Sequence, residues 1–323
     1  DLEQVLKLDH DNSDAKWLLS VLLLETGKAI SAEHLAAEAV EAEPANNAFV
    51  LQHARCLRKL ARYDYAAKLA KQVFNDPDVE PLDKARSLRE MGLLASLGSA
   101  EVAERVIPLL SGAIELADEL ATTEDYHLRI AATKLLVESH LDMALYISKG
   151  KFRQKEASVP EWIERASGIS EQLIACDDSQ TLHRLYVAVT ALAAGANLEP
   201  PIDPALWIEE AEMTAVKLRD ATYDPRLQEL YDWNLGLAYF QAAQIEHLRK
   251  EPESALEFGR LAEDKLSRLA ETRDELPDTS YLMGRLYFQT GAVHAIHHED
   301  HRQACHWYDK AADRLINPFP VTT

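Results

Sequence analysis

Hydrophobic residues recur every three or four positions along almost the whole chain, which is the spacing of one face of an α-helix. Helix-favouring Ala, Leu, Glu, Lys and Arg fill these segments, whereas Gly supplies only 11 of the 323 residues. Runs that alternate Val, Ile, Thr and aromatic residues with polar ones, as strands require, are few. The pattern therefore predicts an all-α chain.

An internal repeat is visible near the beginning of the chain. Each copy is predicted to form two helices joined by a turn, in the first copy over 15–25 and 31–42, with Pro44 after the second helix. Small residues at these positions let helices approach to about 8–10 Å. Shifting the first copy by 34 positions superposes small or apolar residues, namely Ser20, Leu23, Gly27, Ala32, Ala36 and Ala39 on Ala54, Leu57, Ala61, Ala66, Ala70 and Val73.

This arrangement, with Pro44 and Pro77 after the second helices, resembles the tetratricopeptide repeat. Two features depart from that family, because Ala61 stands where the turn usually has Gly and no Tyr fills the bulky position of either first helix. The resemblance implies about seven helix pairs in a right-handed α-α superhelix, a tetratricopeptide-like solenoid, whose concave side is lined by the first helix of each pair. Regular units are expected over 1–121, the first of them truncated, and elongated pairs over 122–323, continuous with the regular ones.

The later, longer units are aligned by four aromatic residues, each followed four positions later by Ala. Their first helices are expected over 126–148, 223–249 and 279–299, and prolines are expected to mark the starts of the second helices. Trp162, Trp207, Trp233 and Trp307 are interpreted as core packing. The aligned aromatic residues are Trp162, Trp207, Phe258 and Trp307, and the prolines are Pro160, Pro204 and Pro252. Pro318 and Pro320 predict that the last helix ends near Ile316.

Composition narrows the possible functions. The formal net charge is −20, which argues against nucleic acid and anionic membranes as partners. No apolar stretch approaches the roughly 20 residues needed to cross a bilayer. The three cysteines, Cys56, Cys176 and Cys305, form no CxxC pair, so they are expected to be reduced, mostly buried and in a cytoplasmic protein. The chain opens as if within a helix, so it is expected to be a piece of a longer protein.

One region opposes the overall acidity. Between Arg55 and Arg89 there are nine basic and five acidic residues. Arginine side chains bind carboxylates through paired hydrogen bonds, so basic inward positions would attract an acidic peptide. The sequence therefore predicts a non-catalytic scaffold that binds a protein or peptide, and leaves open that these charges only form solvated faces and pairs within helices. The candidate peptide-binding residues are Gln52, Arg55, Lys59, Arg86 and Arg89.

A histidine cluster provides the alternative function, a regulatory module that binds a small ligand or transition metal in the later half. In a continuous helix, His294 and His298 would form one i, i+4 pair, and His297 and His301 another, a spacing suited to a metal. The competing interpretation places these residues at a junction between helices, with Asp300 capping the second helix. His294, His298 and His301 are the metal-ligand candidates.

Motifs for catalysis are missing from the sequence. No GxGxxG, GxxxxGK[ST] or GxSxG sequence and no kinase signature occurs, so an enzyme is not predicted and no cofactor is expected. Cys176 and Cys305 are interpreted as buried packing residues and not as nucleophiles. Self-association through the acidic outer surface is a third candidate function.

Overall fold

A computed structural model describes residues 2–273 and 277–316. In these residues the chain forms α-helices and one short 310 helix and no strand, so the all-α prediction is confirmed. The chain divides into two compact units, residues 1–143 and 144–323, and α9 (Tyr126–Lys149) crosses the boundary. The expected boundary at 121 and 122 concerns the type of repeat, and it stays a prediction.

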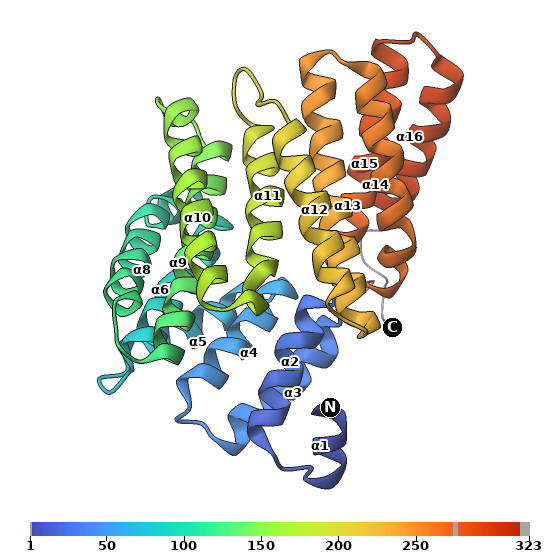
Figure 1. The fold of residues 1–323 in the computed structure, drawn as a ribbon. Helices are drawn as coiled ribbons and strands as arrows, with labels where there is room; N and C mark the ends of the chain where they lie inside the picture. The colour runs from blue at the N-terminus through green and yellow to red at the C-terminus, as the bar shows by residue number, and fades with distance from the viewer. Residues whose placement is uncertain (1, 274–276, 317–323) are drawn as a thin grey trace. The chain divides into compact units, whose positions relative to one another are not determined.

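Unit 1 is built from short helices that pack in pairs. The contacts join α2 to α3, α4 to α5 and α6 to α8, and α3 to α4 and α5 to α6 connect successive pairs. Figure 1 shows these helices following one another in chain order. The helices that precede α9 are α1 (Leu2–Leu8), α2 (Ser13–Glu25), α3 (Ala29–Ala42), α4 (Asn47–Lys59), α5 (Tyr63–Asn75), α6 (Pro81–Ser96), α7 (Ala100–Ala103) and α8 (Val106–Ala121).

The repeated small residues do pack where helices meet. Ala32, Ala36 and Ala39 of α3 are fully buried, and so are their counterparts in α5. The turns between paired helices need a left-handed residue, which Gly27 supplies with φ 86° and Ala61 supplies with φ 58°. A residue with a Cβ in this conformation costs about 1–2 kcal/mol, so packing in unit 1 offsets some backbone strain at Ala61.

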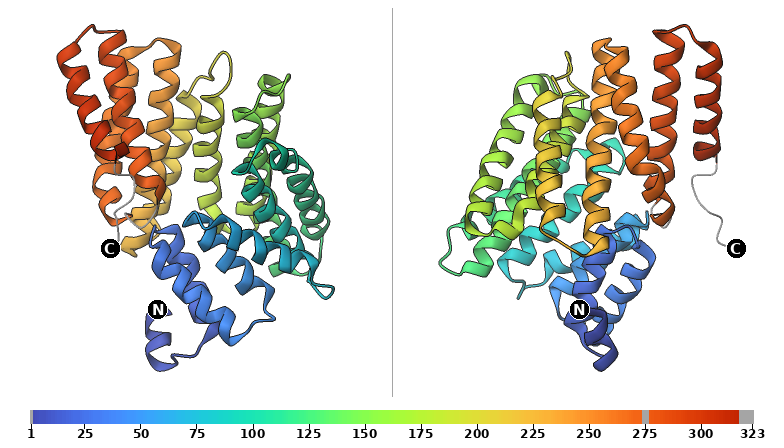
Figure 2. Two further views of the ribbon diagram at one scale, coloured as in Figure 1. Left: turned by 180° about the vertical axis from the view of Figure 1, so that it is seen from behind. Right: turned by 45° about the vertical axis from the view of Figure 1, so that its right-hand side comes forward.

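Four helices of unit 2 are longer than any helix that precedes α9. α13 and α14 share an extensive interface, and so do α15 and α16. Both views of Figure 2 show α13 to α16 side by side in chain order. After α9 the elements are α10 (Lys155–Cys176), the 310 helix η1 (Asp178–Thr181), α11 (Leu182–Gly195), α12 (Ala205–Asp220), α13 (Pro225–Arg249), α14 (Pro252–Thr272), α15 (Pro277–Ile296) and α16 (His301–Ile316).

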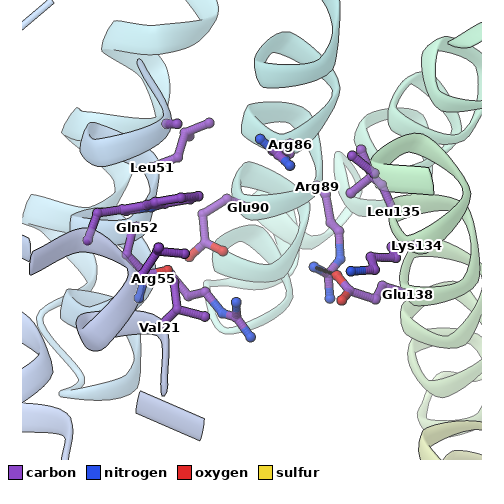
Figure 3. A pocket seen from close by; sticks show the side chains of 14 residues that line it. Val21, Leu51, Gln52, Arg55, Arg86, Arg89, Glu90, Lys134, Leu135 and Glu138 are labelled. Carbon is purple, nitrogen blue, oxygen red and sulfur yellow. Dashed lines mark hydrogen bonds and ion pairs between the residues drawn. The ribbon is translucent and has the colours of Figure 1, made fainter. Parts of the chain in front are cut away.

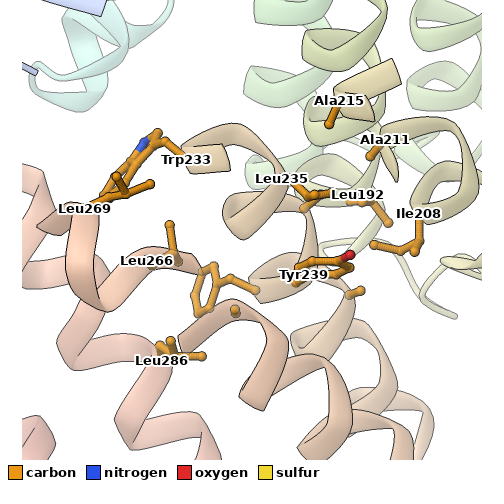
Figure 4. Packing of buried hydrophobic residues seen from close by; sticks show 14 of the residues in the cluster. Leu192, Ile208, Ala211, Ala215, Trp233, Leu235, Tyr239, Leu266, Leu269 and Leu286 are labelled. Atoms are coloured by element: carbon orange, nitrogen blue, oxygen red, sulfur yellow. The ribbon is translucent and has the colours of Figure 1, made fainter. Parts of the chain in front are cut away.

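The main core of unit 2 forms around α13. Figure 4 shows Leu235 and Tyr239 of this helix facing Leu192 and Ile208, while Leu266 lies on the opposite side. The prediction that tryptophans pack in a core is confirmed for three of the four. Trp233 belongs to the buried cluster, and the partly buried residues against it include Trp207 and Trp307, whereas Trp162 is not part of it.

The predicted helix boundaries are partly correct. Pro204 is the N-cap of α12 and Pro252 begins α14, so both mark helix starts as expected. Pro160 instead lies inside α10, which begins five residues earlier at Lys155. The helix predicted over 279–299 ends at Ile296, because Glu299 adopts φ 52° and turns the chain. The segment 317–323, with Pro318 and Pro320, lies outside the described residues.

Candidate functional site

A cavity opens among four helices of unit 1, α2, α4, α6 and α9. Its volume is about 350 Å³, which falls within the range of ligand sites. Figure 3 shows labelled side chains of α4, α6 and α9 around this space. We call it the inner cavity, and it is lined by Trp17, Leu18, Val21, Ala48, Leu51, Gln52, Arg55, Arg86, Arg89, Glu90, Ala131, Lys134, Leu135 and Glu138.

One side of the inner cavity is apolar. Trp17, Leu18 and Val21 come from one face of α2, because residues three and four apart lie together on a helix. The Trp17 ring is held by the buried Phe49, with ring centroids 5.9 Å apart. Leu18 is 44% exposed although it lies beside this packed pair. The cavity therefore offers water-accessible apolar surface on a rigid support.

Arg55 of α4 stands on the polar side and forms an ion pair with Glu25 at the end of α2. The Glu25 charge raises the pKa of Arg55 above its ordinary value, against the opposing effect of burial. The Arg55 side chain keeps 33% of its surface exposed. This guanidinium is thus held in position and still reachable from the cavity.

Arg89 of α6 lies between two carboxylates of α9. It forms ion pairs with Glu138 and with Asp142, the latter at 2.6 Å from Nε to Oδ2. Burial alone would lower the pKa of Arg89, but the charges of Asp142 and Glu138 outweigh it and raise the pKa. Arg89 therefore joins α6 to α9 within unit 1.

A further ion pair connects α4 with α6. Glu90 accepts two hydrogen bonds from Arg58, from Nε at 2.5 Å and from Nη2 at 3.2 Å. Both side chains are nearly buried, with 13% of Arg58 and 9% of Glu90 exposed. A paired arrangement of this kind fixes the relative orientation of the two helices.

The structure brings together four of the five predicted binding residues. Gln52, Arg55, Arg86 and Arg89 line the inner cavity, whereas Lys59 does not. Gln52 is buried and donates to Ser20 Oγ at 3.0 Å. Arg86 pairs with Asp83 of its own helix at 3.0 Å. Their role in binding stays a prediction.

The carboxylates that compensate these arginines were not predicted from the sequence. Glu25 precedes Arg55 by 30 positions, and Glu138 and Asp142 follow Arg89 by 49 and 53 positions. The rules for ion pairs within a helix reach only three or four positions, so they give no signal for such partners. The basic stretch from Arg55 to Arg89 is therefore far less positive in the fold than its composition indicates.

The histidine cluster occupies a junction between two helices. α15 ends at Ile296 and α16 begins at His301, so the interpretation that places these residues at a junction between helices is confirmed, and His297 and His301 do not share one helix. The predicted cap is confirmed, because Asp300 Oδ1 accepts from the Gln303 backbone N–H at 3.0 Å.

The metal interpretation finds no support in the geometry. The rings of His294 and His298 are 5.8 Å apart, and His298 Nε2 lies 3.7 Å from Glu253, while His301 opens the next helix. Within residues 2–273 and 277–316, no three His, Cys, Asp or Glu side chains are arranged to hold a metal ion.

The prediction for the cysteines holds at one position only. Cys56 is buried, and burial raises the pKa of its thiol to about 12. Cys176 and Cys305 are exposed, so their predicted burial is wrong. Cys176 is the last residue of α10, and Cys305 lies beside the buried Ala304 on the outer part of α16. The apolar residues next to Cys176 and Cys305 in the sequence did not indicate that each cysteine lies on the exposed face of its helix.

Comparisons with known proteins give structural likenesses and no relative by sequence. No protein-family model and no curated protein matches the chain. Among solved structures the chain is similar to yeast Tom70, with 12% identity over 97% of this chain and 87% of that chain and a TM-score of 0.23. In the described part of the chain, no helix has the length and apolar character needed to span a membrane. Tetratricopeptide membership stays a prediction.

Proposed function

We propose that unit 1 binds a segment of a partner protein in the inner cavity, and that the protein acts as a non-catalytic interaction scaffold. The supporting observation is that the first helices of successive pairs, α2, α4 and α6, together with α9, place apolar and arginine side chains around one accessible volume. Interfaces are held mainly by apolar and aromatic anchors, with arginine providing directional contacts.

The segment would combine an apolar side chain with a carboxylate. The apolar side chain would contact Trp17 and Leu18, and the carboxylate would reach Arg55 or Arg89. Glu25 and Glu138 already bind these arginines, and each keeps 29% of its side chain exposed. An incoming carboxylate would displace one of them toward solvent, so the exchange conserves the charge-assisted hydrogen bonds.

Display of random twelve-residue peptides on the intact chain tests this function. We expect selected peptides to carry acidic residues next to a large apolar one. Their affinity should fall at least about tenfold for Leu18→Asp, which places a repelling charge on the apolar side. Arg86→Gln should weaken binding less, because only one of several cations is removed.

Lys84→Gln is the matched control for Arg86→Gln. Lys84 lies on the same helix, is exposed and does not line the inner cavity. Its loss removes the same charge and should leave the affinity unchanged. Selected peptides that bind Leu18→Asp as tightly as the unaltered chain would refute the proposed function.

A further inference from the structure

A second cavity lies on a different part of unit 1, among α3, α4 and α5. Its volume is about 490 Å³, and it shares no lining residue with the inner cavity. The helices that form it are the second helices of two successive pairs and the first helix between them. We call it the outer cavity, and it is lined by Glu33, His53, Leu57, Arg62, Tyr65, Lys68 and Leu69.

Part of the lining of the outer cavity is apolar. Leu57 of α4 is 5% exposed, and the partly buried Leu69 of α5 packs against a small buried cluster. Tyr65, also in the lining, has 64% of its surface exposed. Apolar surface of this kind, contributed by two neighbouring helices, favours an aliphatic or aromatic group of a ligand.

The charges around the outer cavity do not cancel. Glu33 faces His53 Nε2 at 3.1 Å and Arg62 Nη1 at 3.7 Å, so its negative charge is already compensated. Lys68 holds its ammonium 5.2 Å from the centroid of the Tyr65 ring. Among the described residues Lys68 has no carboxylate within ion-pair distance. One positive charge, that of Lys68, is therefore left in the lining together with Leu57 and Leu69.

We propose that the outer cavity binds an apolar group that carries a carboxylate, with the apolar part on Leu57 and Leu69 and the carboxylate on Lys68. An ammonium held against an aromatic face keeps hydrogen-bond donors for a second partner. The site is separate from the proposed function, because neither cavity needs the other.

A titration of the intact chain with octanoate tests the proposal, followed by NMR of the leucine methyl groups. Octanoate should shift the Leu57 and Leu69 methyl signals, and octanamide, which lacks the charge, should bind at least about fivefold more weakly. Lys68→Gln should reduce octanoate affinity to that of octanamide. Lys71→Gln removes the same charge from an exposed position of α5 outside the cavity and should have no effect.

Two results would overturn the proposal. The first is equal binding of octanoate and octanamide at these methyl groups, and the second is an equal effect of Lys68→Gln and Lys71→Gln. The amidated dipeptide N-acetyl-Leu-Glu, titrated in parallel, separates the two sources of this chemistry. Tighter binding of the dipeptide assigns the cavity to a partner chain, and tighter binding of octanoate assigns it to a free carboxylate.

Discussion

α4 of unit 1 and α13 of unit 2 are both first helices of a pair, yet the side chains at their packed faces differ in polarity. α4 has 13 residues and directs Gln52 and Arg55 toward the inner cavity, where ion pairs connect it to its neighbours. α13 has 25 residues and buries Trp233 and Phe240 in an apolar core. The same place in a helix pair can therefore support either a polar cavity or a core, depending on the side chains that it carries.

The largest effect is expected from Phe240→Ala in the core of unit 2. Phe240 is 1% exposed, and its loss removes transfer free energy and leaves a cavity. We expect the free energy of unfolding to fall by about 3–5 kcal/mol in urea titrations followed by circular dichroism. Phe288→Ala, at a position 56% exposed, is the control and should cost less than about 1 kcal/mol. Similar losses for both variants would contradict an apolar core around α13.

The stability of unit 1 should depend on the nearly buried ion pair between Arg58 and Glu90. Arg58→Ala leaves the Glu90 carboxylate nearly buried without its partner, which should lower the free energy of unfolding by about 3 kcal/mol. The double variant Arg58→Leu with Glu90→Leu removes both charges and should recover most of that loss. Thermal unfolding of the three chains measures the difference. If the double variant is as unstable as Arg58→Ala, the loss cannot come from an unpaired buried charge at Glu90, and this explanation is contradicted.

Two helical glycines give a matched test of close helix packing. A Cβ on Gly236 would lie 2.7 Å from Leu266 of α14, whereas a Cβ on Gly168 would meet nothing within 4 Å. Gly236→Ala should therefore destabilise by about 1–3 kcal/mol. Gly168→Ala should stabilise by about 0.5–1 kcal/mol through helix propensity. Melting temperatures that move in the same direction would be inconsistent with the close approach of α13 and α14.

The smallest effect is a pH dependence located in unit 2. Burial, and then the neighbouring His297, lower the pKa of His247 below its ordinary 6.5, and the buried Nδ1 of His247 has no hydrogen-bond partner. The folded state thus binds fewer protons than the unfolded state. Its stability is complete above pH 6.5 and declines as the pH falls below that value. His247→Gln should flatten this part of the stability profile, and an unchanged profile would exclude His247 as its source.

The sequence predicts most of the fold because the patterns that specify the helices and their pairing involve residues close together in the chain. Helical periodicity, the repeated small residues and the turn at Ala61 each involve residues within one pair. The aromatic core residues Trp207 and Trp307 were found by their shared spacing to Ala211 and Ala311. The predicted end of a helix was wrong where a single residue determines it. Glu299 adopts a left-handed conformation after α15, whereas the hydrophobic pattern would continue the helix.

The candidate site could be predicted only in part, because it joins separate helices. Arg55 and Arg89 were selected correctly as lining residues from helical spacing. Their partners Glu25 and Glu138 lie 30 and 49 positions away, at distances in sequence that no local rule covers. Cys305 shows the same limit, since its exposure depends on how α16 is turned against its neighbours.

A methyl NMR titration with a peptide selected on the intact chain tests the central claim most directly. Binding in the inner cavity predicts that the largest shifts occur at Leu18, Val21, Leu51 and Leu135, with little change at Leu57 and Leu69 of the outer cavity. Shifts concentrated in unit 2, or spread evenly over the chain, would contradict the assignment of the binding site to α2, α4, α6 and α9.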